Sequence, residues 1–305
     1  MSLADLERSS AELPRSISLI VNPAAGGGRA GRRLESVRRA LSSHRLEHHV
    51  EPTRSLEHAS QLAGAAAAAG EVAVAFGGDG LIGAVGDALR DSEGVLGVLP
   101  GGRGNDLARV LGIPLDPAAA CQVLATGRVR TIDLGQAAGH TFVGIASCGF
   151  DSDANRIANQ ARLIRGNLVY TYGALRALVG WRPATFVITL DGERTRTIVG
   201  YTIAAANSKA YGGGMYAAPH AELDDGLLDV VTCADMPKHR LLTSVLPKIF
   251  KGTHVNEPEV TELRATEVTI AADRPFTLYA DGDPIAELPV SVRVLPNAVR
   301  VLVPR

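Results

Sequence analysis

Three apolar segments near the start of the chain are each followed by a glycine-rich turn. Residues 16–21 (SISLIV) precede NPAAGGG, residues 71–76 (EVAVAF) precede GGDG, and residues 95–99 (VLGVL) precede PGGRG. Each glycine run leads into a segment whose apolar residues have helical spacing. Strands that alternate with helices predict a parallel sheet, in which all three turns lie at the edge formed by the carboxyl ends of the strands, where ligands bind.

The pattern changes from about Thr131 onward to short apolar segments separated by turns, as in residues 140–146, 185–191 and 197–206. Such spacing is typical of an antiparallel sandwich or barrel. One helical segment, from Ala154 to about Val179, interrupts this part. The sequence therefore predicts an α/β domain with a parallel sheet over residues 1–133, and an antiparallel β-sandwich domain over residues 134–290.

The charge balance excludes one class of partner. Lys and Arg number 31 against 32 Asp and Glu, a net charge of −1, which argues against a nucleic-acid binder held by bulk positive charge. Three widely spaced cysteines (Cys121, Cys148 and Cys233) predict no disulfide framework. The amino-terminal segment is polar, and no run of about 18 apolar residues occurs, so we expect a soluble cytoplasmic protein.

Asp79 is the informative residue of the GGDG turn. Backbone N–H groups at a strand-to-helix turn suit a phosphate, which repels a carboxylate unless a divalent cation lies between them. One interpretation is therefore a role with Mg²⁺ and a nucleotide, and the other is a turn residue that caps the helix beginning at Leu81. None of the turns matches the GxxxxGK[ST] loop or a GxGxxG turn with a following acid, which disfavours NTPases of that type and simple dinucleotide-binding dehydrogenases.

Five motifs in order carry a family resemblance: VNPAAGGG, AFGGDG, LPGGRGNDLARVLGIP, DDGLLDV and YADGDP. Together they resemble the diacylglycerol kinase catalytic family, which includes sphingosine and ceramide kinases, from about Ser16 to the end of the chain. NAD kinases share GGDG, but Asn105 and Asp106 stand in the PxGxxND context of the lipid kinases. The resemblance also implies that the last strand returns to the first domain, which adds residues 291–305 to it.

The resemblance implies a binding site for ATP and Mg²⁺ at the turns, with Asp79 at the metal–nucleotide centre. The implied nucleotide-binding residues are Asn22, Pro23, Gly26, Thr53, Gly77, Gly78, Asp79, Gly80, Gly83, Arg103, Asn105 and Asp106. A structural Mg²⁺ site is implied at Glu222, Asp225 and Leu227, mostly through backbone carbonyls. Asp283 stands where the family has the Glu of DGE, its general base, and Asp79 is the rival for that catalytic role.

Three positions depart from the family pattern. Leu81 replaces the Thr of GGDGT, which removes a hydroxyl near the phosphates, and Arg103 replaces the Thr of PxGT, where its guanidinium can donate to phosphate. Asp283 is one methylene shorter than Glu, so the site must close further or use a water molecule to reach the acceptor proton.

The expected activity is transfer of the γ-phosphoryl group of ATP to a lipid hydroxyl, with diacylglycerol as the acceptor and phosphatidic acid as the product. The alternatives are a kinase for a sphingoid base or another hydroxyl, and a catalytically weak homologue that binds nucleotide or lipid. A homodimer is left open.

Two stretches without Asp or Glu suggest contact with a membrane surface. Residues 154–190 hold five arginines and Tyr170, Tyr172 and Trp181, and residues 236–256 hold Lys238, Arg240, Lys248 and Lys251. They predict local positive patches suited to an anionic leaflet and thus peripheral membrane association, with ordinary solvated faces as the alternative. The glycine-rich loop YGGGMYAAP (residues 211–219) resembles the family's segment near the metal site, and we expect it to shape the lipid cleft.

Overall fold

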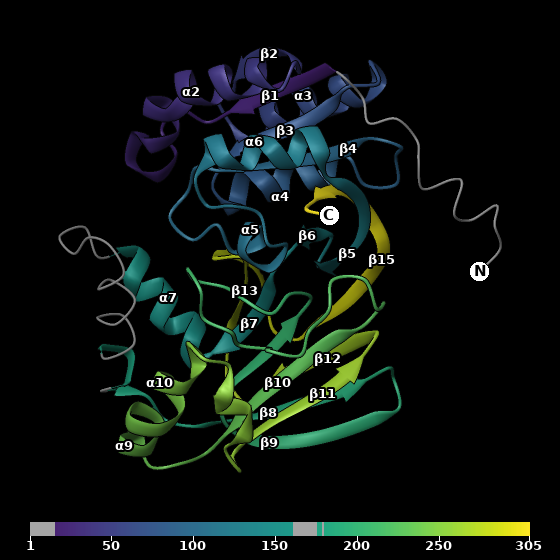
Figure 1. The fold of residues 1–305 in the computed structure, drawn as a ribbon. Coiled ribbons are helices and arrows are strands. Elements are labelled where there is room, and N and C mark those ends of the chain that lie inside the picture. Colours follow the sequence, from purple (N-terminus) through teal and green to yellow (C-terminus); the bar gives the residue numbers. More distant parts are fainter. Residues whose placement is uncertain (1–15, 161–175, 179) are drawn as a thin grey trace.

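The structure is a computed structural model, and it describes residues 16–160, 176–178 and 180–305. The amino-terminal lobe forms the upper part of Figure 1 and the carboxy-terminal lobe the lower part. The elements of the first lobe are β1 (Ser16–Val21), α2 (Ala25–Ser43), β2 (Glu47–Pro52), α3 (Leu56–Ala68), β3 (Val72–Gly77), α4 (Asp79–Ala88), β4 (Val95–Pro100), α5 (Asp106–Val110) and α6 (Pro117–Thr126).

The first lobe contains the predicted parallel sheet, with strands in the order β2-β1-β3-β4. Every residue of β3 and β4 is buried, because helices cover both faces of the sheet. This burial explains why these strands are continuously apolar in the sequence. The core is almost entirely aliphatic, with Phe76 as its large aromatic residue.

The second lobe is mostly antiparallel, as predicted. Its elements are β5 (Arg128–Ala137), β6 (His140–Phe142), β7 (Ile145–Gly149), α7 (Phe150–Gln160), β8 (Ala184–Leu190), β9 (Arg194–Ala206), β10 (Leu228–Ala234), α9 (Lys238–Arg240), η2 (Leu241–Val245), α10 (Leu246–Ile249), η3 (Thr253–Asn256), β11 (Val260–Ala265), β12 (Glu267–Ala272), β13 (Thr277–Ala280), β14 (Asp283–Glu287) and β15 (Val290–Val303). Its own core is partly aromatic, since Trp181 stacks on Tyr201 and meets Phe150 edge to face.

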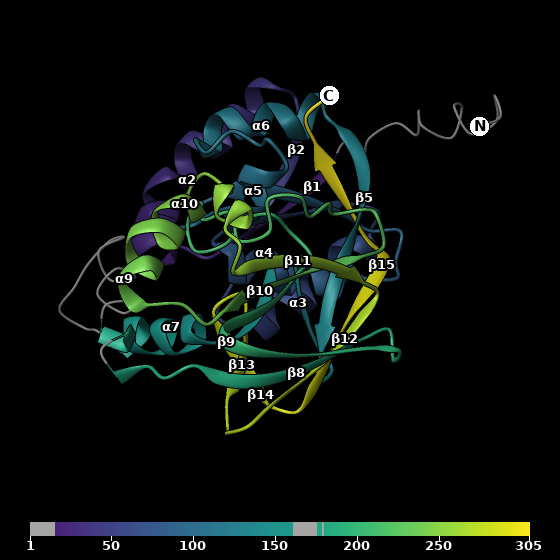
Figure 2. The same ribbon diagram turned by 90° about the horizontal axis from the view of Figure 1, so that it is seen from below.

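The last strand joins the two lobes. β15 pairs with β12 and β5 of the second lobe and, near its end, runs parallel to β4 through Arg300 and Val301. All strands therefore belong to one continuous sheet, although two separate hydrophobic cores lie along it. Figure 2 shows β15 from below, at the right of the molecule and leading to the carboxyl terminus. The division into residues 1–133 plus 291–305 and residues 134–290 remains our proposal for the domain boundaries.

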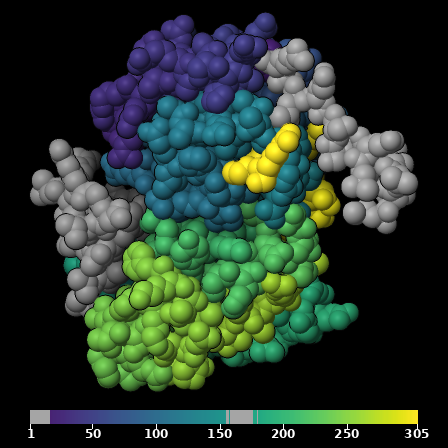
Figure 3. Space-filling view, in the orientation of Figure 1, coloured from purple at the N-terminus to yellow at the C-terminus, as the bar shows by residue number. Residues whose placement is uncertain are grey.

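Part of the predicted helix after Ala154 lies outside the described residues, together with Arg162, Arg165, Tyr170 and Tyr172 of the predicted basic stretch. The portions described are α7 (Phe150–Gln160) and residues 176–178, which are also helical. Across the described ranges, no helix is long and apolar enough to span a bilayer. The two lobes pack against each other in the space-filling view of Figure 3, with the coil between β9 and β10 at their junction.

Candidate active site

The three glycine turns meet at one edge of the parallel sheet. The Gly101 N–H donates a hydrogen bond of 2.7 Å to the Gly77 carbonyl, and the Asn22 N–H donates one of 3.1 Å to the Phe76 carbonyl. A Cβ on Gly102 would lie only 2.5 Å from the Gly78 Cα. The turns therefore touch through their backbones, which requires residues without side chains and confirms the expected gathering of the turns.

The first turn and the end of β2 complete this edge. Gly26 has φ of +61°, and a Cβ there would lie 2.4 Å from the Gly101 carbonyl oxygen. Thr53, directly after β2, donates its N–H to the Val21 carbonyl over 2.8 Å. Asn22 accepts a hydrogen bond from the Ala24 N–H, and Pro23 is exposed beside it. The structure thus brings the predicted residues of the first turn, and Thr53, to the same edge as the other two turns.

Asp79 connects two of the turns. Its carboxylate accepts hydrogen bonds from the backbone N–H groups of Asn105 (2.9 Å) and Asp106 (2.7 Å) at the start of α5. It does not cap its own helix, since Gly78 is the N-cap of α4 and supplies no side-chain bond. The Asn105 side chain is bonded at both ends to the Gly102 backbone. Asn105 therefore shapes the loop, while Asp79 fixes its position.

Asp106 reaches across to the second lobe. Both of its carboxylate oxygens accept a hydrogen bond from the Gly213 N–H, at 3.1 and 3.0 Å. Burial raises the pKa of the Asp106 carboxyl, the Gly213 N–H partly offsets this, and the negative charge of Asp79 raises the pKa further. The predicted glycine-rich loop thus closes onto the turn that carries Asp106.

Asp281 is the acid at the tip of the β13–β14 hairpin. Its carboxylate accepts hydrogen bonds from the N–H groups of Val143, Gly144 and Ile145 at 2.8 to 3.1 Å. Part of the residue meets solvent, but the walls around its carboxyl remove enough water to raise its pKa, and the charge of Asp79 adds to this effect. We refer to Asp79, Asp106 and Asp281 as the cleft carboxylates.

Two predicted features of the site lie elsewhere than expected. Asp283 is exposed on β14 and does not line the cleft, whereas Asp281, two residues earlier, does. Leu81 is buried, and a Cβ on Gly77 would lie 2.6 Å from its Cδ2, so its side chain packs under the turn and not beside a phosphate. Arg103 is exposed and lines the cleft, as its expected contact with a phosphate requires. Gly80 and Gly83 leave open space around them.

A cavity of about 740 Å³ extends from the cleft carboxylates into the second lobe. One end is polar and carries Asp79, Arg103 and Asp281. The opposite wall is mainly apolar, and its residues include Phe150, Ala204, Val231, Leu241, Leu242, Val245, Leu246, Ile249, Phe250 and Val260. The cavity thus joins a phosphate-type edge to a space suited to hydrocarbon.

Asp151 is a cavity residue that the sequence did not single out. Burial raises the pKa of its carboxyl to about 6, although hydrogen bonds from Ser147, Ser152 and Thr202 work in the opposite direction. Burial also raises the pKa of the nearby Tyr211 phenol, with the charges of Asp151 and Asp106 adding to the effect. No sequence signal marked Asp151, because its place depends on how α7 packs on β7 and β9.

A second group of acids contains the predicted structural Mg²⁺ site. Arg130 donates two hydrogen bonds to Asp224, and Arg264 lies 3.5 Å from Asp225 and bonds the buried Asp229 at 3.1 Å. We call these five residues the acid–arginine cluster. The Asp225 carboxylate also accepts the Leu227 N–H. Arg264 therefore already supplies positive charge at Asp225, and the Mg²⁺ site at Glu222, Asp225 and Leu227 stays a prediction.

The comparisons with known proteins agree with this geometry. A family model described as the diacylglycerol kinase catalytic domain matches residues 16–137, and one described as the YegS C-terminal NAD kinase beta sandwich-like domain matches residues 144–303. A protein named diacylglycerol kinase from Mycobacterium tuberculosis is 36% identical over 302 residues, with 95% of each chain covered. The chain belongs to the diacylglycerol kinase family.

Other members of the diacylglycerol kinase family and two solved structures extend the likeness. A diacylglycerol kinase from Bacillus subtilis is 29% identical over 77% of this chain and 78% of its own, and a probable lipid kinase YegS-like from Pseudomonas aeruginosa is 32% identical over 76% of each. A putative diacylglycerol kinase from Bacillus anthracis matches with a TM-score of 0.78 at 22% identity, covering 95% of this chain and 97% of that one. An NAD kinase from Archaeoglobus fulgidus in complex with ATP matches with a TM-score of 0.51 at 12% identity, covering 94% and 93%. These two structures show the fold.

The cleft carboxylates suit a magnesium ion that arrives with a nucleotide. Along the described part of the chain, no three His, Cys, Asp or Glu side chains are grouped closely enough to hold a metal by themselves. Mg²⁺ usually binds through one or two carboxylates together with water and substrate phosphates. In this diacylglycerol kinase family member, Asp79, Asp106 and Asp281 can supply the carboxylates, and the phosphates would have to supply the rest.

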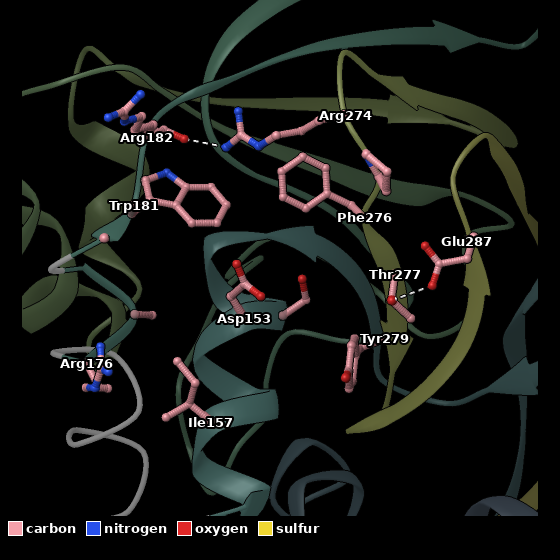
Figure 4. A pocket seen from close by; sticks show the side chains of 14 residues that line it. Asp153, Ile157, Arg176, Trp181, Arg182, Arg274, Phe276, Thr277, Tyr279 and Glu287 are labelled. Carbon is pink, nitrogen blue, oxygen red and sulfur yellow. Dashed lines mark hydrogen bonds between the residues drawn. The ribbon is translucent and has the colours of Figure 1, made fainter.

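A second cavity, of about 780 Å³, lies beyond the first turn of α7 (Figure 4). Ser152 and Tyr279 line both cavities and so separate them. The Arg274 guanidinium lies over the rings of Trp181 and Phe276 at 5.5 and 4.9 Å, where the cation stabilises this aromatic wall. Asp153 points into the space in Figure 4, so the cavity does not have the uniform positive charge of an anion site.

Proposed function

We propose that the protein is a lipid kinase that transfers the γ-phosphoryl group of ATP to the free hydroxyl of diacylglycerol, giving phosphatidic acid and ADP. One observation carries the proposal: the touching glycine turns and the cleft carboxylates form one end of a cavity whose other walls are apolar. A phosphate-binding edge that opens into a hydrocarbon-sized space suits an acceptor with a polar head and acyl chains. The names of the relatives support the same substrate class.

The turns would hold the triphosphate of the nucleotide. Backbone N–H groups at the start of α4 favour negative charge, and Arg103 can donate to a phosphate oxygen from the cleft edge. The N–H groups of Asn105 and Asp106 at the start of α5 are already bonded to Asp79. When bound, Mg²⁺ would neutralise charge on the phosphates, and Asp79 and Asp106 are the residues placed to hold it. Phosphoryl transfer depends mainly on such positioning and charge neutralisation.

Asp281 is the residue that we propose to orient the acceptor hydroxyl and take its proton. It lines the cavity, the N–H groups of Val143, Gly144 and Ile145 fix its carboxylate, and its raised pKa makes it a stronger base than an ordinary aspartate. Asp283, the base expected from the family motif, is exposed outside the cavity. Asp79 is already committed to two N–H groups of α5.

Asp151 supports a second candidate acceptor. Its carboxyl faces a cavity that is otherwise mainly apolar, and in its ionised form it would accept hydrogen bonds from the amine of a sphingoid base. A sphingoid base carries an amine and two hydroxyls at the head of its chain, whereas diacylglycerol offers one hydroxyl. The catalytically weak homologue is the third alternative, since Asp283 departs from the family motif.

The test is incubation of the full chain with γ-labelled ATP, Mg²⁺ and a panel of lipids in mixed micelles. Label on diacylglycerol supports the proposal, and label on the sphingoid base alone supports the second acceptor. Label only on a water-soluble acceptor contradicts both. Nucleotide-induced thermal stabilisation without any transfer identifies a binding protein. The cytoplasmic location, the lack of a nucleic-acid partner and the homodimer stay predictions.

A further inference from the structure

The mouth of the inter-lobe cavity is bordered by an exposed aromatic patch. Phe250 and Pro247 both line the cavity and are exposed, so they stand at its rim. Tyr216 is held beside them, because its N–H donates a 2.9 Å hydrogen bond to the Ile249 carbonyl. With Lys251, which follows Phe250, these residues form what we call the rim patch (Tyr216, Pro247, Phe250 and Lys251).

The exposure of the rim patch is unusual for this molecule. Phe250 is 59% exposed, the highest value among the large apolar side chains of the described residues, and Tyr216 is 37% exposed. The same segment turns its other apolar residues inward, since Leu241 and Val245 are buried and line the cavity. η2 is a π-helical turn, a rare element that is frequently found at functional sites. Residues 241–250 thus form a wall of the cavity, and the Phe250 ring is left exposed at its edge.

The charges of this segment are largely compensated within the protein. Arg240 pairs with Glu257 and Glu259, and Lys248 pairs with Glu257. Lys251 has no carboxylate within ion-pair distance among the described residues, and the ammonium of a lysine can stay in the headgroup layer while its stem lies along apolar surface. The positive patch predicted from residues 236–256 is therefore smaller than its count of lysines and arginines suggests.

We propose that the rim patch inserts into a phospholipid leaflet and that acyl chains pass beside Phe250 into the cavity. This inference rests on the proposed lipid acceptor, whose chains must leave a bilayer to reach the cleft. Tyrosine and lysine are residues that favour the interfacial layer of a membrane, and phenylalanine favours the layer beneath it. Figures 1 and 2 both place α9 and α10 at one side of the molecule with α7.

If the rim patch inserts into a leaflet, burial of its apolar side chains should contribute more to membrane binding than its positive charge. Burial of an exposed phenyl ring accounts for at least about a tenfold change in affinity, and one lysine near an anionic surface for about fivefold. We therefore expect Phe250→Ser to weaken vesicle binding about tenfold or more, and Lys251→Gln about fivefold. Binding should fall only slightly with added salt, because the rim patch carries one uncompensated cation.

The experiment is co-sedimentation of the full chain with vesicles of phosphatidylcholine containing phosphatidylglycerol, without ATP. Leu56→Ser is the matched control, because Leu56 is 47% exposed on α3 in the other lobe. Phe250→Trp should bind like the wild type and shift its tryptophan emission to the blue on vesicles. Equal binding of Phe250→Ser and wild type, equal weakening in Leu56→Ser, or binding that salt abolishes would overturn the inference.

A second assay separates this inference from the proposed function. Short-chain dihexanoylglycerol dissolves as monomers, so its phosphorylation needs no membrane. If the wild type phosphorylates it but does not bind vesicles, the inference fails and the proposed function stands. If the wild type binds vesicles through Phe250 but phosphorylates no lipid, the proposed function fails and the membrane surface remains.

Discussion

The cleft carboxylates and the acids of the acid–arginine cluster are held by different kinds of partner. The cleft carboxylates are held by backbone N–H groups, and within the described residues no Lys, Arg or His nitrogen lies within 4 Å of them. In the acid–arginine cluster, Arg130 and Arg264 neutralise the acids directly. Backbone amides orient a carboxylate without cancelling its charge. The charge of Arg109 offsets that of Asp106 only in part, so the cleft is left with negative charge that a cation from outside can balance.

Because of this difference, we expect the cleft carboxylates to serve activity and the acid–arginine cluster to serve stability. Burial, with a smaller contribution from the charge of Asp79, raises the carboxyl pKa values of Asp106 and Asp281, which costs folding free energy at neutral pH. The hydrogen bond from Arg130 instead lowers the pKa of Asp224, which stabilises the fold at neutral pH. Substitutions in the cleft should thus abolish activity with little loss of stability, and substitutions in the cluster should do the reverse.

The largest effect is expected for Asp79→Asn. The amide keeps one of the two oxygens that accept N–H groups of Asn105 and Asp106, and it removes the charge at the metal–nucleotide centre, so we expect kcat to fall roughly thousandfold. The unfolding midpoint without nucleotide should stay near that of the wild type. Steady-state kinetics and thermal unfolding measure both quantities, and Asp224→Asn, in the cluster, is the control with normal turnover. A variant that keeps a tenth of the wild-type kcat would remove Asp79 from the catalytic centre.

The two acids of the DGD hairpin offer a matched comparison. Asp281 lines the cavity and Asp283 does not, so Asp281→Asn should lower kcat about a hundredfold and Asp283→Asn less than about threefold. Because the pKa of Asp281 is raised, wild-type kcat should rise with pH through that pKa, and this rise should vanish in Asp281→Asn. The reverse ranking would return the role of base to Asp283, as the family motif implies.

The sequence predicted that the glycine turns lie together, but it did not predict which acid of the β13–β14 hairpin faces the cleft. Strand, glycine turn and helix recur with little ambiguity, and parallel strands must place the turns together. The hairpin signal was also present, since Asp281 and Gly282 have φ of +48° and +96°, the two positive values of the turn that an Asp-Gly pair favours. The family motif, however, points to Asp283 and not to Asp281. Which acid faces the cleft follows from this turn and from the pairing of β13 with β7.

Other features could not be predicted because they depend on contacts between distant segments. The burial of Leu81 under Gly77 requires the angle at which α4 leaves β3. The bond from Gly213 to Asp106 joins residues 107 positions apart. The ion pairs of Arg240 and Lys248 use acids just beyond the stretch that the sequence marked as basic. Local composition therefore overstated the positive charge that this surface shows to solvent.

Arg264→Gln tests whether the acid–arginine cluster stabilises the fold. It leaves the Asp229 side chain, which is 1% exposed, without its cation. Breaking a buried pair costs about 3–5 kcal/mol, and because Arg264 is half exposed we expect a loss of about 2 kcal/mol in the free energy of unfolding.

The pH dependence of this loss has a definite sign. Burial already raises the pKa of Asp229, with Arg264 opposing it, so removal of Arg264 raises the pKa further. The penalty is then full above that pKa and shrinks as the pH falls through it. Urea unfolding at pH 7.5 and pH 5 should show the larger loss at pH 7.5, with kcat retained at both. A loss of kcat without a loss of stability would mean that Arg264 serves activity and not folding stability.

The smallest effect is expected for Asp224→Asn. Arg130 donates hydrogen bonds of 2.8 and 2.7 Å to its carboxylate, but both side chains are about one-third exposed, and such pairs contribute up to about 1 kcal/mol. Because the pKa of Asp224 is lowered in the fold, the contribution is present above its ordinary value of 3.8 and disappears as the pH falls through the lowered pKa. Thermal unfolding should separate variant and wild type slightly at pH 7 and not at all once Asp224 of the wild type is fully protonated. A difference that persists in acid would mean that Asp224 acts through packing, and the contrast with the cleft would then rest on Arg264 alone.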